Sequence, residues 1–306
     1  MSKTPVRRIK TISELHELRG LPKPEHPLIS VIDLGSINES HMSEPMTLVY
    51  DFYMIALKSN CHAKFRYGQQ EYDFDEGVMS FMSPNQVFGI APRDEEGPRQ
   101  TGWIMLIHPD FLWNTPLAKA IRQYEFFDYS VNEALFLSER EEATIIGIIQ
   151  NIRDEYHSSI DKFSQDIIVS QIEVLLNYSD RFYHRQFITR KVTNHKILDR
   201  LEDILNEYFS GEDLMEKGLP SVQYIAEALN VSPNYLSSLL KVLTGQSTQQ
   251  HIHEKLIEKA KEKLSTTDLS VSEIAYALGF EHPQSFSKLF KLKTNLSPLE
   301  FRRSFN

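Results

Sequence analysis

Cysteine is nearly absent from this 306-residue sequence: Cys61 is the only one, so no disulfide can form within the chain. Such usage fits a reducing compartment. No apolar run approaches the roughly 18 residues that a membrane-spanning helix requires. The basic N-terminal residues are not followed by the apolar stretch of a signal peptide. From these absences we expect a cytoplasmic protein.

Signatures of the common enzyme classes are missing as well. The sequence has no P-loop, no Gly-x-Gly-x-x-Gly and no Gly-x-Ser-x-Gly. A metal-binding cupin needs two histidines two residues apart on a strand, together with a carboxylate and a further histidine, whereas His62 and His108 each lack such a neighbour. The only His-x-His, His251-Ile252-His253, falls in a predicted helix, where positions i and i+2 diverge by about 200°. We therefore predict no enzymatic activity, no metal site and no cofactor.

The balance of charge gives little support for any one function. Residues 221–306 contain 10 basic and 8 acidic side chains and so carry +2, which leaves −11 for the first 220 residues of a chain whose net charge is −9. A DNA-binding domain usually has a clearer basic footprint than this. Charge alone therefore does not indicate a nucleic-acid partner.

Short apolar runs separated by turn residues dominate the sequence from Pro27 to about His108. The candidate strands are Ile29–Leu34, Thr47–Leu57, Cys61–Tyr67, Gln70–Phe74, Val78–Met82, Gln86–Ile90 and Thr101–Ile107. Several short strands at regular spacing predict a small antiparallel barrel. Aromatic residues in these strands either line a ligand pocket or fill the barrel interior.

A helical pattern follows from Pro116 to about Arg185. Ser138-Glu139-Arg140-Glu141 is a capping box that opens one amphipathic helix, and a second begins near Phe163. Their apolar stripes either pack against the barrel or form a homodimer interface. We expect a first domain of residues 1–185 with its helical part at about 113–185, a linker at 186–194, and a second domain of residues 195–306 that opens with a helix from His195 to Phe209.

One pattern occurs twice near the C-terminus. The stretch from Ile225 to Val231 returns 49 positions later as Ile274 to Phe280. Beyond the next turn the offset becomes 50, so that Ser247 corresponds to Ser297. A repeat of this kind indicates two copies of one supersecondary unit joined by a fixed connector.

Each copy has the features of a helix, a tight turn and a second helix. In the first copy Ser221 and Ser232 are the predicted N-caps, and in the second Ser270-x-x-Glu273 is a capping box and Gly279 ends the helix. Two such helices form a helix-turn-helix, whose second helix can enter a DNA major groove. The predicted connector helix, Thr248–Leu264, has 17 residues and a length of roughly 26 Å. It would hold the two units about one DNA turn, roughly 34 Å, apart.

The two copies also contain a specific residue pattern. It runs Ile225-Ala226, Ser232-x-x-Tyr235-Leu236-Ser237-x-x-Leu240-Lys241, Gly245, Ala260-x-x-x-Leu264, Ser272-Glu273-Ile274-Ala275-Tyr276-x-Leu278-Gly279-Phe280, Phe286-Ser287-Lys288-x-Phe290-Lys291 and Ser297-Pro298-x-x-Phe301-Arg302. In this pattern, which covers roughly the last hundred residues, the sequence resembles the AraC/XylS family of transcription regulators. Less specifically, Gly77 and the following residues to Pro84 resemble the cupin-type sensor domain of such regulators.

The resemblance implies an α+β protein of two domains. These are an N-terminal cupin-like antiparallel β-barrel with a helical hairpin, and a C-terminal all-α domain with two helix-turn-helix units joined by a connector helix. It implies sequence-specific DNA binding and transcriptional control, usually activation, often by a homodimer that senses a small molecule. RNA polymerase is then a further partner. The alternatives are a regulator that has no effector or is controlled by a protein partner, and a cupin enzyme fused to a DNA-binding domain.

The outward-facing residues of each second helix are the candidate DNA contacts. The residues predicted to contact bases are Asn234, Ser237, Ser238 and Lys241 in the first unit and Gln284, Ser285 and Lys288 in the second. The residues predicted to contact phosphates are Ser232, His282 and Lys291. The sequence does not identify residues that bind an effector.

Overall fold

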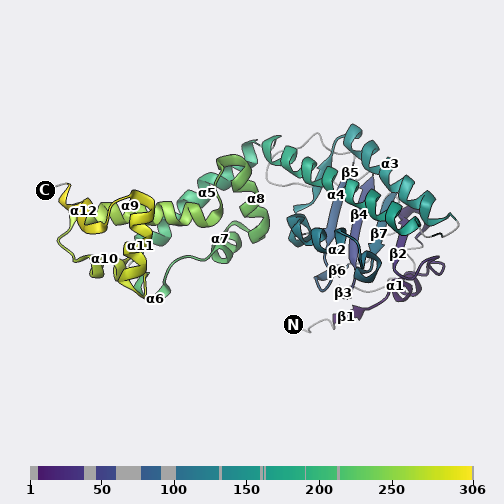
Figure 1. Cartoon of the computed structure of the whole chain (residues 1–306), viewed down its shortest axis with the longest axis horizontal. Helices are drawn as coiled ribbons and strands as arrows, with labels where there is room; N and C mark the ends of the chain where they lie inside the picture. The colour runs from purple at the N-terminus through teal and green to yellow at the C-terminus, as the bar shows by residue number, and fades with distance from the viewer. Residues whose placement is uncertain are drawn as a thin grey trace. The chain divides into compact units, whose positions relative to one another are not determined.

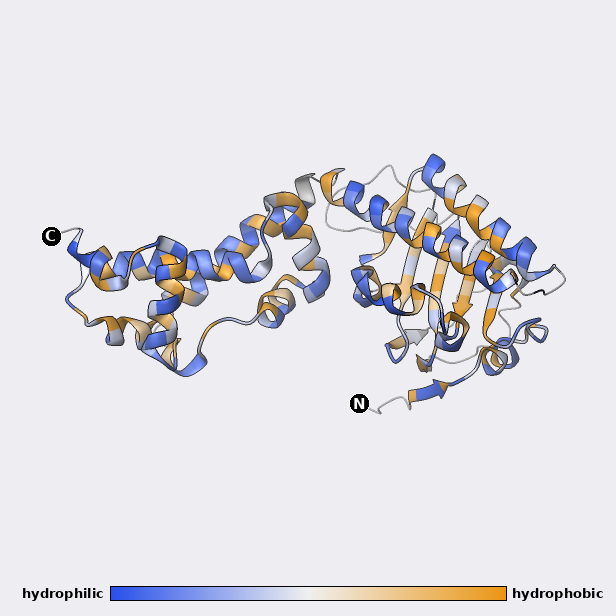
Figure 2. Cartoon of the chain, in the orientation of Figure 1, coloured by the Kyte–Doolittle hydropathy of each residue, from blue (hydrophilic) through white to orange (hydrophobic). Residues whose placement is uncertain are grey.

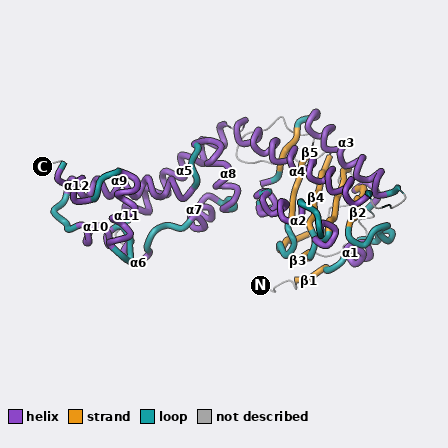
Figure 3. Tube along the Cα trace, in the orientation of Figure 1, coloured by secondary structure: helices purple, strands orange, loops and turns teal. Residues whose placement is uncertain are grey.

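The computed structural model describes residues 6–37, 46–59, 77–90, 101–130, 133–158, 161, 163–189, 191–211 and 214–304. The chain divides into two compact units, Met1–Gln186 and Phe187–Asn306 (Figure 1). Among the described residues, all strands belong to the first unit, and the second is helical (Figure 3). The predicted order of a sheet-containing part followed by an all-α part is confirmed.

The described strands of the first unit form two sheets. The larger has the order β2-β7-β4-β5-β8, with all neighbours antiparallel. Its strands are β2 (Ile29–Asp33), β4 (Tyr53–Ser59), β5 (Gly77–Met82), β7 (Thr101–Ile107) and β8 (Leu135–Leu137). The smaller has the order β1-β3-β6 and consists of β1 (Val6–Ile9), β3 (Met46–Tyr50) and β6 (Val87–Ile90).

The two sheets are connected at Asp51 and Phe52. The sequence predicted one strand over Thr47–Leu57, but the chain bends at these two residues and passes from β3 to β4. The bend is held by the backbone N–H of Asp51, which donates to the carbonyl of Ile9 at 3.1 Å, and by an ion pair of 2.7 Å between Asp51 and Arg8. The predicted strands Cys61–Tyr67 and Gln70–Phe74, and with them Cys61 and His62, lie outside the described residues.

Strand β1 was not predicted because its sequence, Val-Arg-Arg-Ile, buries only Ile9. It pairs in parallel with β3, whereas the predicted barrel was antiparallel throughout. The short helix α1 (Ile12–Leu18) follows, and its buried Ile12 and Leu15 join Ile9 in a core with β3 residue Leu48. Burial of Ile9, Ile12 and Leu15 therefore attaches the N-terminal segment to the smaller sheet.

Helices α3 (Glu139–Tyr156) and α4 (Ser164–Thr189) cover the larger sheet. Helix α3 packs against β2 and β8, and the predicted capping box of Ser138 and Glu141 opens it. The guanidinium of Arg185 on α4 donates to both carboxylate oxygens of Glu141, at 3.0 Å and 2.5 Å, and so joins the two helices. The apolar side of each helix faces inward (Figure 2). The sequence left two roles open for these apolar stripes, packing within the chain or forming a homodimer interface. Most of their residues are buried within the chain.

The second unit contains eight described helices. They are α5 (Lys191–Ser210), α6 (Leu214–Lys217), α7 (Val222–Leu229), α8 (Pro233–Thr244), α9 (Thr248–Thr266), α10 (Val271–Ala277), α11 (Pro283–Thr294) and α12 (Pro298–Arg303). The stretch 186–194, predicted to be a linker, is helical up to Thr189 and again from Lys191, so the helix expected at His195 begins earlier. No glycine or proline interrupts this stretch. The Asn194 amide also donates to the carbonyl of Phe187 at the end of α4.

Candidate nucleic-acid interface

The first helix-turn-helix consists of α7 and α8. The Ser221 hydroxyl accepts a hydrogen bond from the Tyr224 N–H and starts α7, which ends at Asn230 with φ 56°. The Ser232 hydroxyl then accepts from the Tyr235 N–H at 3.2 Å, and Pro233 occupies the first position of α8. Ser221 and Ser232 each satisfy a free N–H at a helix start, and Pro233 has no N–H to satisfy. The turn is therefore formed by local chemistry.

The second helix-turn-helix, α10 and α11, has the same construction. Ser270 and Glu273 form the predicted capping box, and the hydrogen bonds from Ser270 lower the pKa of the Glu273 carboxyl. Gly279 follows α10 with φ 84°. Pro283 occupies the first turn of α11, which ends at Asn295 with φ 61°.

The two units exchange glycine and asparagine at equivalent left-handed positions. Asn230 after α7 corresponds to Gly279 after α10, and Gly245 after α8 corresponds to Asn295 after α11. All four have positive φ, between 56° and 84°. Glycine adopts this region without steric cost, and asparagine tolerates it better than most residues. The repeat therefore extends from the sequence pattern to the backbone conformation.

Helix α9 is the predicted connector, confirmed with 19 residues, which corresponds to about 28 Å. One hydrophobic core contains residues of both units and of α9 between them. Its members on helices α8, α9, α10 and α11 are Leu236, Leu240, Ile252, Leu256, Ile257, Ala260, Leu264, Ile274, Ala275, Phe286 and Phe290. The outer side of α9 carries ion pairs between Lys255 and Glu258 and between Lys259 and Glu262, at 2.9 and 3.0 Å. Since a shared core fixes both units to the same helix, they form one body rather than two tethered modules.

Every predicted contact residue of the second helix-turn-helix is exposed. Gln284, Ser285 and Lys288 follow one another at helical spacing on α11, with buried Phe286 and Phe290 on the opposite side. Neither Gln284 nor Lys288 has a side-chain partner among the described residues. His282, at the N-cap position, and Lys291, in the last turn, are exposed too.

The predicted contact residues of the first helix-turn-helix are less accessible. Lys241 is exposed, but Asn234, Ser237 and Ser238 are half-buried. The Ser237 hydroxyl lies 3.2 Å from the hydroxyl of Thr248, the first residue of α9, which is fully buried. The Ser232 hydroxyl is buried at the start of α8. The structure therefore offers a broader polar surface on α11 than on α8.

Aromatic residues of the N-terminal unit, Met1–Gln186, pack on one another. The ring of Phe81 lies 4.4 Å from that of Phe126, and the ring of Tyr53 lies 5.1 Å from that of Phe127, in each case measured between centroids. Tyr50 stacks on Phe52 at 4.8 Å. These rings are buried and fill the interior, which was one of the two predicted roles of the strand aromatics. The remaining candidates between residues 61 and 76 lie outside the described part of the chain.

The histidines and carboxylates that the structure describes do not gather into a metal site. Within the described ranges, no group of three or more His, Cys, Asp or Glu side chains is arranged to hold a metal ion. His108 instead accepts a hydrogen bond from the Asp110 N–H at 3.2 Å, and His251 lies 2.9 Å from the Thr244 hydroxyl. In the same described part of the chain, no helix combines the length and apolarity needed to span a bilayer.

A feature that the sequence pattern did not explain is the role of Arg302. Its guanidinium donates to the carbonyl oxygens of Leu264, at the end of α9, and Leu269, just before α10, at 3.2 and 2.7 Å. Arg302 therefore fixes α12 to the loop that precedes the second helix-turn-helix. No local sequence signal predicts this pairing, because the partners are backbone carbonyls more than thirty positions away.

Comparison with known proteins gives a consistent match for the helical part. A family model described as a helix-turn-helix domain matches residues 225–304. The HTH-type transcriptional regulator YijO of Escherichia coli is 37% identical over 82 residues, which span 27% of this chain and 29% of YijO. The HTH-type transcriptional activator RhaS of Salmonella dublin is 24% identical over 266 residues, which span 83% of this chain and 86% of RhaS.

Among solved structures, the C-terminal domain of the response regulator yesN from Fusobacterium nucleatum is 30% identical over 34% of this chain and 95% of that chain, with a TM-score of 0.30. ToxT from Vibrio cholerae is 13% identical, spans 91% of this chain and 97% of its own, and also has a TM-score of 0.30. The curated relatives named above are transcription regulators.

Proposed function

Because the C-terminal unit contains an AraC-type helix-turn-helix domain, we propose that this protein is a sequence-specific DNA-binding regulator of transcription. The observation that supports this most strongly is the pair of helix-turn-helix units built on one core around α9. On such a body, α8 and α11 are positioned to enter successive major-groove segments on one face of the duplex. The second helix-turn-helix offers an exposed polar surface on α11 for contact with DNA bases.

Base contacts from α11 follow from the chemistry of its exposed side chains. The Gln284 amide can donate to and accept from adenine, and the Lys288 ammonium can donate to guanine O6 and N7. Ser285 can pair with any base edge. His282 and Lys291, near the two ends of the helix, contact phosphates on either side of the groove.

In the first helix-turn-helix, Asn234, Ser238 and Lys241 contact bases. Ser232 contacts a phosphate only if its hydroxyl, which is buried, becomes accessible. Ser237 contributes to base recognition only if it gives up its interaction with Thr248, which lies 3.2 Å away. We therefore propose that α11 supplies the greater share of the base contacts. The prediction from sequence named base contacts in both helix-turn-helix units without ranking them.

We assign effector sensing and dimerisation to residues 1–185 and DNA binding to residues 195–306, with 186–194 connecting them. The protein acts as a homodimer that activates transcription through RNA polymerase; the match to the activator RhaS supports activation.

The surface for a second copy is apolar and lies on or next to α4. It consists of Phe163, Ile167 and Val174, which are exposed at near-helical spacing. A small effector would change activity by binding two arrangements of the protein unequally.

The test is selection of DNA by the purified full-length protein from fragmented genomic DNA, at physiological salt and with competitor DNA. We expect enrichment of one motif about two helical turns long, because two recognition helices one turn apart contact that length. The matched control is the double variant Gln284→Ala, Lys288→Ala, which should lose part of the motif. Recovery of random fragments by a folded protein would contradict the proposal.

A further inference from the structure

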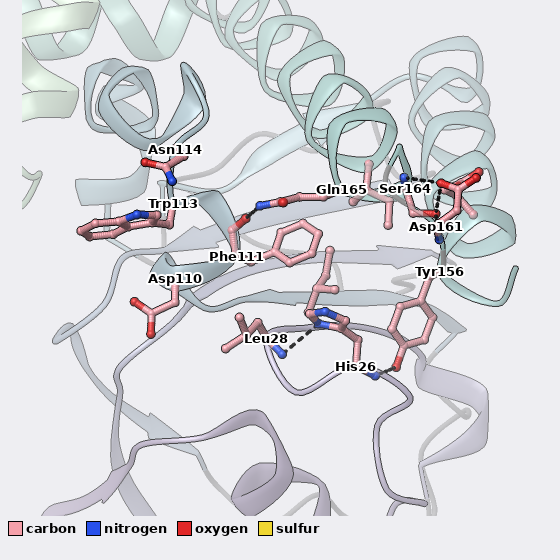
Figure 4. Close-up of a pocket in the computed structure, with 13 residues that line it drawn as sticks. His26, Leu28, Asp110, Phe111, Trp113, Asn114, Tyr156, Asp161, Ser164 and Gln165 are labelled. Atoms are coloured by element: carbon pink, nitrogen blue, oxygen red, sulfur yellow. Dashed lines mark hydrogen bonds between the residues drawn. The ribbon is translucent and has the colours of Figure 1, made fainter. Parts of the chain in front are cut away.

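A cavity with a volume of about 510 Å³ lies beside the start of β2 in the N-terminal unit. Its walls come from the stretch around His26, the turn Pro109–Leu112 with Trp113 and Asn114, the end of α3 and the start of α4 (Figure 4). Volumes of roughly 300–1,000 Å³ are typical of sites for small molecules. The cavity is separate from the ring-filled interior formed by Tyr53, Phe81 and their neighbours.

Among the described residues that line this cavity, the charged side chains are all acidic. Asp110, Glu155 and Asp161 contribute to the wall, and none of the described residues that line it is a lysine or an arginine. Asp161 caps α4 with one carboxylate oxygen, which accepts from the N–H groups of Phe163 and Ser164 at 2.7 and 3.1 Å. The Glu155 carboxylate accepts no hydrogen bond from any described residue. A concave site lined by one sign of charge attracts ligands of the opposite sign.

Aromatic rings form much of the remaining wall. The Trp113 side chain is 68% exposed although it is large and apolar, whereas Phe111 is 4% exposed. In Figure 4, Trp113 lies at one end of the cavity and Tyr156 at the other, with Phe111 between them. The face of an aromatic ring attracts an organic cation, most strongly when the ring is Trp or Tyr. The rings and the Glu155 carboxylate therefore favour the same class of ligand.

The polar groups of the wall are held in place by the protein backbone. The Tyr156 hydroxyl accepts from the Glu25 N–H at 2.7 Å, which leaves its proton free to donate. The Gln165 amide donates to the Phe111 carbonyl at 2.7 Å, which leaves its oxygen free to accept. His26 accepts from the Leu28 N–H through Nδ1 at 3.1 Å, and burial lowers the pKa of His26. The neutral ring therefore keeps its proton on Nε2, so His26 adds no positive charge to the site.

We propose that this cavity binds a small organic cation, an amine or quaternary ammonium carried on an apolar or aromatic body. The cation lies against Tyr156 and near the Glu155 carboxylate, and the apolar body lies along Phe111 and Leu28 toward Trp113. A role of this ligand as the effector rests on the proposed regulatory function. The binding itself does not, and it is tested without DNA.

The test is calorimetric titration of the full-length protein with phenethylammonium and with its neutral analogue 2-phenylethanol. We expect saturable binding of the cation and at least about fivefold weaker binding of the alcohol, because the alcohol lacks the charge. The fluorescence of Trp113 should change on saturation, and this change should persist in Trp103→Phe and disappear in Trp113→Phe. Equal binding of the alcohol, or no saturation by the cation up to about 10 mM, would overturn the proposal.

Two charge variants on one helix separate a specific site from a general attraction. Glu155→Gln removes the carboxylate at the cavity, whereas Glu139→Gln removes one from the exposed first turn of the same helix α3. We expect Glu155→Gln to weaken phenethylammonium binding about three- to fivefold, the size of one partly exposed ion pair, and Glu139→Gln to leave it unchanged. Equal effects of the two variants would show that the cavity does not hold the cation. Loss of DNA selection with cation binding retained would contradict only the regulatory function.

Discussion

Gly279 lies directly against the backbone of Gly218. A Cβ atom at Gly279 would come within 2.9 Å of the carbonyl carbon of Gly218 and 3.0 Å of its oxygen. The same carbonyl accepts a hydrogen bond from the Tyr208 hydroxyl at 3.1 Å. The turn of the second helix-turn-helix is thus packed on the segment after α6, and only glycine fits at this contact.

The first prediction concerns this contact. Gly279→Ala should lower the free energy of unfolding by about 2 kcal/mol or more, because alanine meets backbone atoms and also has to adopt a left-handed conformation. Gly245→Ala is the matched control: its φ is 75°, but a Cβ there meets nothing within 4 Å. It should cost only about 1 kcal/mol. Urea unfolding measures both, and equal losses would contradict the packing.

The second prediction concerns Arg302. Arg302→Ala should lower stability by about 1 kcal/mol, because two hydrogen bonds from a partly exposed guanidinium to backbone carbonyls are lost. Arg303→Ala, which removes an exposed neighbour in the same turn, should have little effect. Thermal or urea unfolding distinguishes them. A larger loss from Arg303→Ala would show that charge, and not the contacts to Leu264 and Leu269, determines the stability of α12.

The third prediction concerns pH. Burial, and to a smaller extent the nearby charge of Lys293, lowers the pKa of His253 below the ordinary histidine value of about 6.5. The unfolded chain then binds a proton more readily than the folded chain. Stability should therefore be unaffected above 6.5 and should fall as the pH drops from there through the folded-state pKa.

His253→Gln removes this titration while keeping a polar partner for the Gln249 amide, which lies 2.9 Å from the ring. Its urea midpoint should fall less than that of the wild type between about pH 7 and about pH 5. Burial also lowers the pKa of His251, so part of the decline should remain. Parallel declines of the two proteins would show that His253 does not contribute.

The fourth prediction concerns base contacts. Lys288→Ala and Gln284→Ala should each weaken specific DNA binding by about 1–3 kcal/mol if they contact base edges. Lys293→Ala removes the same charge from the same helix α11 but at a position near His253, away from the proposed contact surface. It should weaken specific and non-specific binding alike and only slightly. Binding isotherms on the selected motif and on random DNA compare the three variants.

The helical unit was predictable from sequence because its signals are local. Caps such as Ser221 and Ser270 and the left-handed residue Gly279 each act within one turn of a helix, and the repeat gave two independent copies of the same evidence. The first unit depends on pairings between distant segments. The parallel pairing of β1 with β3 and the change of sheet at Asp51 have no local signature, so neither was predicted.

The candidate contacts divide in the same way. Helical spacing was sufficient to predict that Gln284 and Lys288 face outward, and they do. It could not show that Ser237 would face Thr248, because that depends on how α8 packs against α9. The cavity beside β2 was missed since its walls come from four separate stretches of sequence.

Footprinting of the full-length protein on its selected motif tests the central claim most directly. With methylation and hydroxyl-radical probes, two protected major-groove segments should appear on one face of the DNA, about one helical turn apart. The double variant Gln284→Ala, Lys288→Ala should lose protection of one segment and keep the other. A single protected segment in the wild type, or two segments unchanged in the variant, would contradict the account of two helix-turn-helix units that contact bases together.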